Sequence, residues 1–301
     1  MVVSDEVKEA LRSGRGVVAL ETTIVVHGLP VPLNLEVARR CEDAVRSVGA
    51  TPATIGVLDG RVVVGLSPSE LAALAEPSRH NPKLSSRDIG MALSENLSGA
   101  TTVAGTIAIA SHAGIDVMAT GGLGGVHRDA QETFDESADL TALSRTSMLV
   151  VASGVKSILD VGATLERLDS LGVAVVGFAT RQFPGFYRAE SGFSIDWSVD
   201  DAEGAARAFL AHREFSRTGF LLANPVAVDR QLDEVLHQEA LASAFDHAHR
   251  LGVRGKEVTP VLLAEFARFT SGVSVMVNRD LVVANALLAG RVAVVVADLA
   301  A

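Results

Sequence analysis

Short apolar runs recur along this chain and alternate with segments of helical spacing. Two of them, Val17–Leu20 and 148–152, consist only of valine, leucine, alanine and methionine. Uninterrupted runs of this length are typical of strands buried on both faces, as in parallel sheets covered by helices. The alternation therefore predicts an α/β protein, a three-layer α/β/α sandwich with a central, largely parallel mixed sheet.

The remaining elements follow the same alternation. Further strands are predicted at 54–66 (as a pair around the turn at 59–60), 116–119, 172–178 and 219–223. Helices are predicted at 4–13, 34–48, 158–171, 201–212 and 232–251, and a capping box at 67–70 begins another. The valine-rich tail 291–299 is compatible with strand or helix. No repeat or break in composition divides the chain, so residues 1–301 are predicted to form a single domain.

Charge and composition argue against several classes of partner. The net charge is -10 and the pI is near 5.3, whereas nucleic acids and anionic membranes are bound by clustered positive charge. The single cysteine, Cys41, allows no internal disulfide and fits a reducing compartment. The N-terminus lacks a signal-peptide pattern, and no apolar stretch approaches the roughly 20 residues of a membrane span. We therefore expect a cytoplasmic protein without nucleic-acid or membrane partners.

Two ionisable side chains lie just after predicted strands. Glu21 follows Val17–Leu20 directly, and Lys156 comes shortly after the strand at 148–152. Open α/β sheets bind ligands at the carboxyl ends of their strands, so both side chains are candidates for a site at that edge. A carboxylate in this position also serves as a turn or helix-cap acid, and the sequence leaves both roles open for Glu21.

Lysine is rare in this sequence, which makes Lys156 unusual. The chain has four lysines and 22 arginines, so a generic positive charge is nearly always supplied by arginine. The compact lysine amine differs from guanidinium because it can lose its proton and attack a carbonyl carbon. The alternative is a structural ion pair, and the residue types leave these two roles for Lys156 open.

A glycine-rich segment and two acids lie between these candidates. Residues 119–128 have the sequence ATGGLGGVHR, and glycines at this density after a strand bring backbone N–H groups close to an anionic ligand. Neither the dinucleotide fingerprint nor the phosphate-loop motif matches. Asp135 and Asp139 follow four residues apart, so on a helix they would share a face that suits a Mg²⁺ or Mn²⁺ ion. Either aspartate alone also fits a helix cap.

Three other segments carry candidate functions. The polar stretch 81–88 contains Lys83 and Arg87, a composition that fits a phosphate site and equally a solvated loop. Residues 101–103 begin a helix of small residues. The stretch 182–187 gathers aromatic residues that the chain otherwise lacks, which fits a pocket wall but is explained more simply by loop anchoring.

Seven blocks of the sequence carry a resemblance to a known family. In order, they are ALETTIVVHGLP (19–30), GATTVAGTIAIASHAGI (99–115), ATGGLGGVHR (119–128), TFDESADL (133–140), SGVKSILD (153–160), ANP (223–225) and GKEVTPVLL (255–263). They resemble the pseudouridine-5'-phosphate glycosidases, also called the indigoidine synthase A-like family. The resemblance implies reversible cleavage of the C–C glycosidic bond of pseudouridine 5'-phosphate to uracil and D-ribose 5-phosphate, one Mn²⁺ per subunit, and a homotrimer.

The resemblance also implies roles for particular residues. Lys156 matches a nucleophile that forms an imine with the ring-opened sugar, Glu21 matches the proton donor, and Asp135 matches the metal ligand. The family's substrate-binding positions match Lys83, Val103, Ser137, Ala138, Asp139 and Asn278, with Lys83 placed at the phosphate and Asn278 near the base. The alternatives are another imine-forming sugar-phosphate lyase, a pigment-biosynthesis relative, and a non-catalytic nucleotide-binding module, which would not need the lysine.

Overall fold

The computed structural model of the chain describes residues 1–253 and 258–300. One mixed sheet lies at the centre, and its main path runs β1-β4-β3-β2-β7-β8-β11-β9-β10. The strands are β1 (Val2–Val3), β2 (Val17–Leu20), β3 (Thr51–Leu58), β4 (Arg61–Val64), β5 (Lys83–Leu84), β6 (Gly99–Thr101), β7 (Val117–Ala119), β8 (Leu149–Ala152), β9 (Ala174–Phe178), β10 (Trp197–Val199) and β11 (Phe220–Ala223).

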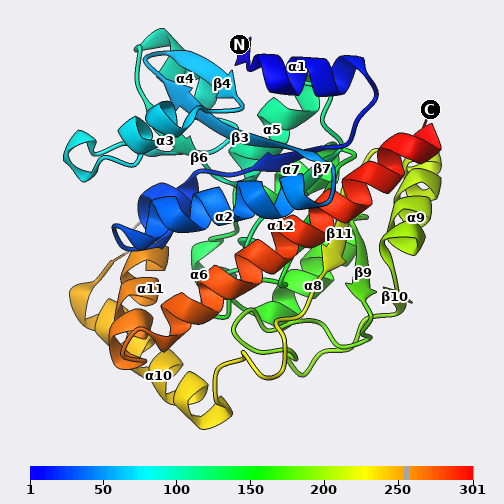
Figure 1. Ribbon diagram of the computed structural model, residues 1–301. Helices are drawn as coiled ribbons and strands as arrows, with labels where there is room; N and C mark the ends of the chain where they lie inside the picture. The colour runs from blue at the N-terminus through cyan, green and yellow to red at the C-terminus, as the bar shows by residue number, and fades with distance from the viewer. Residues whose placement is uncertain (254–257, 301) are drawn as a thin grey trace.

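Helices cover both faces of this sheet, which confirms the predicted three-layer sandwich (Figure 1). Helices α2, α9 and α12 pack together on one face, while α5, α7 and α8 lie on the other. The helices are α1 (Asp5–Arg12), η1 (Ile24–Gly28), α2 (Leu33–Ser47), α3 (Pro68–Leu74), η2 (Pro77–Arg79), α4 (Ile89–Ser94), α5 (Val103–His112), α6 (Ala130–Thr133), α7 (Ala138–Arg145), α8 (Val161–Ser170), α9 (Ala202–Phe215), α10 (Glu234–Leu251), α11 (Val258–Phe269) and α12 (Val273–Ala300).

The parallel part of the sheet brings distant chain segments to one edge. Strands β2, β7, β8, β11 and β9 all run in the same direction. Leu20 lies opposite Ala119, which in turn lies opposite Val151. The segments that follow these strands therefore emerge side by side, and they contain Glu21, the glycine-rich loop and Lys156.

The start of α7 differs from the sequence prediction. The helix begins at Ala138, because the Ser137 hydroxyl caps it by accepting the Asp139 N–H at 3.2 Å. Just before it, Phe134 has a positive φ of 54°, a conformation that interrupts a right-handed helix. Asp135 therefore precedes the helix, and the expectation that Asp135 and Asp139 share a helical face was wrong.

One other helix start also shifts. Helix α8 begins at Val161 and not at residue 158, because the Asp160 carboxylate caps it by accepting the Ala163 N–H at 2.9 Å. Helix α11 is described from Val258 onward, with Thr259 inside it. The preceding block 255–257 lies outside the described residues.

The valine-rich tail is helical and belongs to α12, which crosses one face of the sheet (Figure 1, red). Among the described residues, α12 is a helix long and apolar enough to cross a membrane by length and composition, with a mean hydropathy of 1.9. The expectation that no apolar stretch approaches the length of a membrane span was wrong. In the sequence, charged residues such as Arg279 and Arg291 divide the apolar run, but in the structure one helix continues through both. In this fold 56% of its most apolar window is buried, and it packs on β2, β7 and β8.

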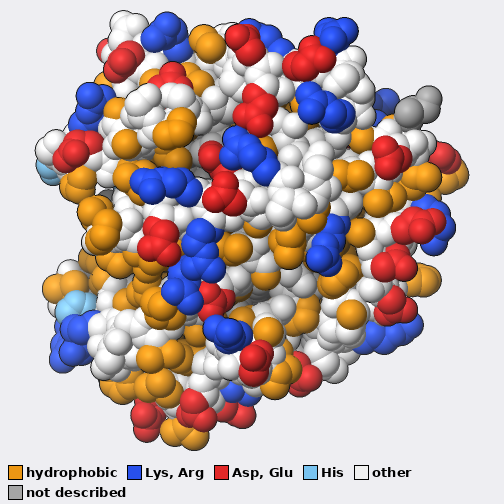
Figure 2. Space-filling model, in the orientation of Figure 1, with side chains coloured by type: hydrophobic (Ala, Val, Ile, Leu, Met, Phe, Trp, Pro, Cys, Tyr) orange, Lys and Arg blue, Asp and Glu red, His pale blue; other side chains and the backbone are white. Residues whose placement is uncertain are grey.

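The outer surface of α2 and α12 carries charges of both signs. Figure 2 shows acidic and basic side chains interspersed with apolar ones on this face. On α2, Arg46 lies 3.5 Å from Glu42 and Arg40 lies 3.9 Å from Glu36. This face does not gather the positive charge that a nucleic-acid surface requires.

Candidate active site

A cavity of about 420 Å³ opens at the carboxyl edge of the parallel strands, and a smaller one of about 70 Å³ adjoins it. The two cavities share wall residues, among them Glu21, Lys83 and Lys156. The sequence-predicted residues in the wall of the outer cavity are Glu21, Lys83, Val103, Asp135, Ser137, Ala138, Asp139 and Lys156. Asn278, from α12, lines the inner cavity. The structure thus brings the whole predicted set together.

Glu21 is a buried acid at the junction of the two cavities. It is 9% exposed, and the Thr120 hydroxyl at the end of β7 donates a hydrogen bond to its Oε1. Burial raises the pKa of Glu21 above 4.5, although the Lys156 charge and the Thr120 hydrogen bond oppose that rise. A carboxyl group whose pKa is raised by burial beside a cavity holds its proton to a higher pH than a free carboxyl group, which suits a proton donor.

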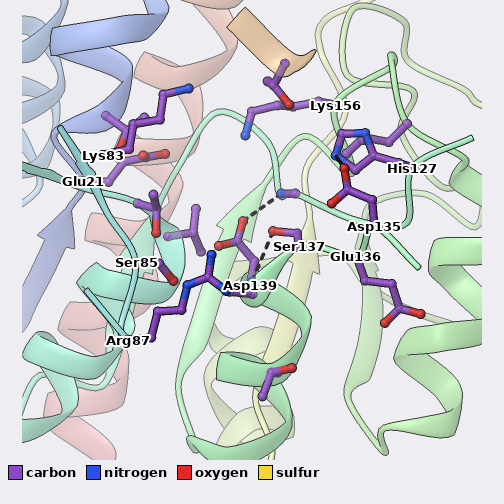
Figure 3. Close-up of a pocket in the computed structure, with 18 of the residues that line it drawn as sticks. Glu21, Lys83, Ser85, Arg87, His127, Asp135, Glu136, Ser137, Asp139 and Lys156 are labelled. Atoms are coloured by element: carbon purple, nitrogen blue, oxygen red, sulfur yellow. Dashed lines mark hydrogen bonds and ion pairs between the residues drawn. The ribbon is translucent and has the colours of Figure 1, made fainter. Parts of the chain in front are cut away.

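Two lysine amines enter the outer cavity from different elements. Figure 3 shows Lys83, from β5, above Glu21, and Lys156, from the segment after β8, pointing into the same space. The Lys156 backbone is fixed by its N–H, which donates to Leu123 O at 3.1 Å. Its amine forms no hydrogen bond or ion pair with a described side chain, so the ion-pair role left open by the sequence has no partner in this part of the chain.

Asp139 connects two walls of the cavity. Its Oδ1 accepts the N–H of Ala104 in α5 at 2.9 Å, and its Oδ2 accepts the N–H of Gly124 in the glycine-rich loop at 2.8 Å. The side chain is 6% exposed. Because both oxygens accept backbone N–H groups, Asp139 fixes the position of α5 relative to the glycine-rich loop; Figure 3 shows it among the residues that line the cavity.

The outer cavity is suited to an anion. Helices α5 and α7 both begin at its wall, with Val103 and Ala138 as their first residues, so the positive ends of two helix dipoles face it. The Ser85 hydroxyl in the same wall is buried and has no hydrogen-bond partner among the described residues. With Lys83 nearby, these groups form a cradle for a phosphate ester.

Asp135 is the one predicted metal ligand. Its side chain is 35% exposed, and its Oδ2 lies 3.9 Å from His127 Nε2. The described residues include no group of three or more His, Cys, Asp or Glu side chains placed to hold a metal ion. Mn²⁺ and Mg²⁺ are commonly held by one or two carboxylates, with water and substrate oxygens as the other ligands. The donor set therefore fits a loosely held, hydrated ion.

The inner cavity is suited to a flat polar ring. Its walls include Ile24, Gly122 and Phe186, and the Oδ1 of Asn278 is buried there without a hydrogen-bond partner in the part of the chain that the structure describes. Glycine is needed at position 122, because a Cβ there would lie 2.5 Å from the Phe186 ring. Phe186 is itself 3% exposed, so the aromatic segment both anchors its loop and forms a cavity wall.

Two positioning residues were not predicted from the sequence. Thr120 holds Glu21, as described above, and Asn285 in α12 holds Thr120. The Asn285 amide donates to Thr120 O at 2.8 Å and contacts the Ser153 hydroxyl at 3.1 Å, while its Oδ1 accepts from Asn224 at 2.9 Å. The only signal in the sequence was the polar side chain of Asn285 within the otherwise apolar stretch 281–290.

Replacement of Asn285 by leucine is expected to impair both folding stability and activity. The carbonyl of Thr120 and the amide of Asn224 would lose their partners, and each unpaired buried group costs about 1–3 kcal/mol. We expect a lower Tm and a kcat that falls more than KM rises, because Thr120 positions Glu21. Ser274→Ala, at a buried polar site in the same helix but away from both cavities, is the matched control. An unchanged kcat in Asn285→Leu would contradict this role.

Comparison with known proteins agrees with the geometry. Residues 6–295 match the model of the family described as indigoidine synthase A like protein. A pseudouridine-5'-phosphate glycosidase of Salinispora tropica is 55% identical over 96% of this chain and 90% of its own length. Another pseudouridine-5'-phosphate glycosidase, from Streptomyces griseus, is 50% identical over 99% of this chain and 92% of its own length.

Solved structures show the same fold. The prealnumycin C-glycosynthase AlnA, crystallised in complex with ribulose 5-phosphate, superposes with a TM-score of 0.91 at 39% identity, over 99% of this chain and 97% of its own. An indigoidine synthase A-like protein from Thermotoga maritima has a TM-score of 0.88 at 35% identity, over 97% of this chain and 95% of its own. The chain therefore belongs to the indigoidine synthase A-like family of enzymes.

Proposed function

We propose that this enzyme reversibly cleaves the C–C glycosidic bond of pseudouridine 5'-phosphate, giving uracil and D-ribose 5-phosphate. The observation that carries the proposal is the pairing of a buried acid, Glu21, with an unpaired amine, Lys156, where an anion-binding cavity meets a ring-sized one. The names of the curated relatives support the substrate, and the ribulose 5-phosphate bound by AlnA supports a sugar-phosphate ligand.

The two cavities suggest how the substrate is oriented. The phosphate would lie against the starts of α5 and α7, with Lys83 and the Ser85 hydroxyl, and backbone N–H groups near Val103 and Ala138 would complete the cradle. The ribose hydroxyls would reach Ser137 and Asp139. The base would extend into the inner cavity, where the unpaired Asn278 Oδ1 accepts a ring N–H.

Lysine chemistry solves the difficulty of a carbon leaving group. The Lys156 amine would add to C1' as the C1'–O4' bond breaks, and the proton that the nitrogen loses on addition goes to O4'. The C1'–C5 bond then breaks: its electron pair goes to C5 of uracil, which is protonated by Glu21, and the nitrogen lone pair forms the C=N bond of an imine. Water hydrolyses the imine to ribose 5-phosphate and restores the amine.

Asp135 is the residue that would hold a manganese ion. When bound, such an ion supplies charge neutralisation and orients oxygen ligands of the substrate. We expect Asp135→Ala to raise the Mn²⁺ concentration needed for half-maximal activity by at least about tenfold, because it removes the only carboxylate ligand assigned to the ion. Asp135→Asn keeps the shape and removes the charge, and Glu136→Gln controls for a general loss of negative charge at the cavity. A metal titration unchanged in Asp135→Ala would move the ion elsewhere.

A product assay tests the reaction itself. Pseudouridine 5'-phosphate is incubated with the enzyme and Mn²⁺, and uracil release is followed by chromatography; the reverse reaction is run from uracil and ribose 5-phosphate. Formation of C-glycosides from ribose 5-phosphate and an acceptor other than uracil, with none from uracil, would favour a C-glycosynthase activity like that named for AlnA. No turnover in either direction would refute both activities. Homotrimeric assembly stays a prediction, which light scattering can measure.

A further inference from the structure

A second cavity, of about 560 Å³, lies on the other side of the segment that carries Lys156. Leu159 is the one residue that the walls of this cavity and of the outer catalytic cavity share. The second cavity is bordered by the start of α8, the loop 185–193 and the start of α10. None of its wall residues has a part in the proposed reaction.

Unpaired buried polar atoms concentrate at this cavity. Ser157 is 6% exposed and His237 is 7% exposed, and both line the wall. The Ser157 hydroxyl and both ring nitrogens of His237 have no hydrogen-bond partner among the described residues. In the catalytic cavities the corresponding unpaired atoms belong to Ser85 and Asn278. Buried polar groups normally have partners, so both places show the pattern of a site that a ligand completes.

The second cavity also resembles the first in its electrostatics. Helix α8 begins at its wall, and the N–H groups of Val161 and Gly162 donate to no described acceptor. Helix α10 begins there too. Two arginines add positive charge, Arg128 over the Phe245 ring at 4.7 Å and the largely buried Arg188.

The acids in this wall are mostly engaged. Asp160 caps α8 through the Ala163 N–H, and Glu234 pairs with Arg188 at 3.3 Å across the exposed rim. Glu190 lies at the exposed edge of the cavity. Burial and the two arginine charges lower the pKa of His237 to about 4, so its ring is neutral near pH 7 and offers one donor and one acceptor.

We propose that this second cavity binds a small phosphorylated sugar or polyol, separately from the catalytic site. The helix starts and arginines suit the phosphate, and the serine hydroxyl and neutral imidazole suit hydroxyl groups. Ser157 directly follows Lys156, so a ligand in this cavity would contact the segment that carries the nucleophile.

Equilibrium dialysis of the full-length protein with radiolabelled ribose 5-phosphate tests the site. We expect two sites per chain in the wild type, one in the double variant Arg128→Met/Arg188→Met, and one in Lys83→Met, which weakens the catalytic site instead. Arg213→Met, at an exposed arginine paired with Asp116, should keep two. Two results would overturn the proposal. The first is a wild-type protein that binds one ribose 5-phosphate per chain and loses that binding in Lys83→Met. The second is a double variant that still binds two per chain.

A gentler variant guards against misfolding. Ser157→Ala removes a hydroxyl with no partner among residues 1–253 and 258–300, so it should leave stability intact and raise the Kd of the second site by about tenfold. Hydrogen exchange gives an independent measure: ribose 5-phosphate should protect the amides of Val161 and Gly162, and no protection there would count against the site. This result is independent of the proposed reaction. If binding at the second site is lost in the double arginine variant and kept in Lys83→Met, the second site exists even if the enzyme releases no uracil.

Discussion

Lys156→Ala is expected to lower uracil release by more than about a thousandfold, because Lys156 is the amine to which the proposal assigns the covalent intermediate. Lys156→Arg should be equally inactive, since guanidinium keeps its proton and does not act as a nucleophile. The direct measurement is borohydride reduction in the presence of ribose 5-phosphate, followed by mass spectrometry of peptides. The wild type should carry one reduced sugar phosphate on Lys156.

Two other lysines make this experiment discriminating. Lys83 shares the cavity with Lys156. An adduct on Lys83 that persists in Lys156→Ala would show that Lys83 is the nucleophile and that our assignment of Lys156 is wrong. Lys8 is an exposed lysine paired with Asp5 at 3.2 Å, and Lys8→Ala should keep full activity and full labelling. Substantial turnover by Lys156→Ala, or the absence of any adduct on folded wild-type protein, would remove the imine from the mechanism.

The position of the site was predictable from the sequence because it follows from strand order. Residues that come just after buried parallel strands emerge at one edge of the sheet, and this rule predicts from the sequence that Glu21 and Lys156 lie at the same edge. Their separation in the sequence does not matter for such an argument. The roles of the residues came from the family resemblance, since residue types alone left each of them open.

Local features that override spacing explain the errors. Asp135 and Asp139 have helical spacing, yet the αL conformation of Phe134 and the Ser137 cap delay the helix and separate the two acids. The hydrogen bond between Asn285 and Thr120 spans 165 positions in the sequence, and nothing in either neighbourhood indicates the other. Pairings of this kind depend on how α12 packs across the sheet, which a strand and helix pattern does not determine.

The residues that position Glu21 hold it in an unfavourable place for a charged group. A carboxylate so deeply buried is stabilised only in part by Lys156 and by the Thr120 hydroxyl, and burial remains the largest influence on its pKa. Functional sites commonly retain such groups at the expense of stability. Activity and stability should therefore respond in opposite directions when the charge is removed.

Glu21→Gln tests that opposition. The amide has the shape of the acid but no proton to donate, so we expect uracil release to fall by about 10²–10⁴-fold. In the wild type the rate should decline as pH rises through the elevated pKa of Glu21, because the ionised form cannot act as the acid.

The effect on stability has the opposite sign. A carboxyl group whose pKa is raised on folding contributes most stability below its ordinary value of 4.5 and loses that contribution as pH rises through the folded value. The wild type should therefore lose stability relative to Glu21→Gln over that window. Thermal unfolding should give a higher Tm for the variant at mildly alkaline pH and a difference that shrinks in acid, with Glu70→Gln as control because the pKa of Glu70 is lowered by its capping-box hydrogen bonds. If Glu21→Gln retained near wild-type turnover, the proton would have to come from another group, and the raised pKa of Glu21 would have no part in catalysis.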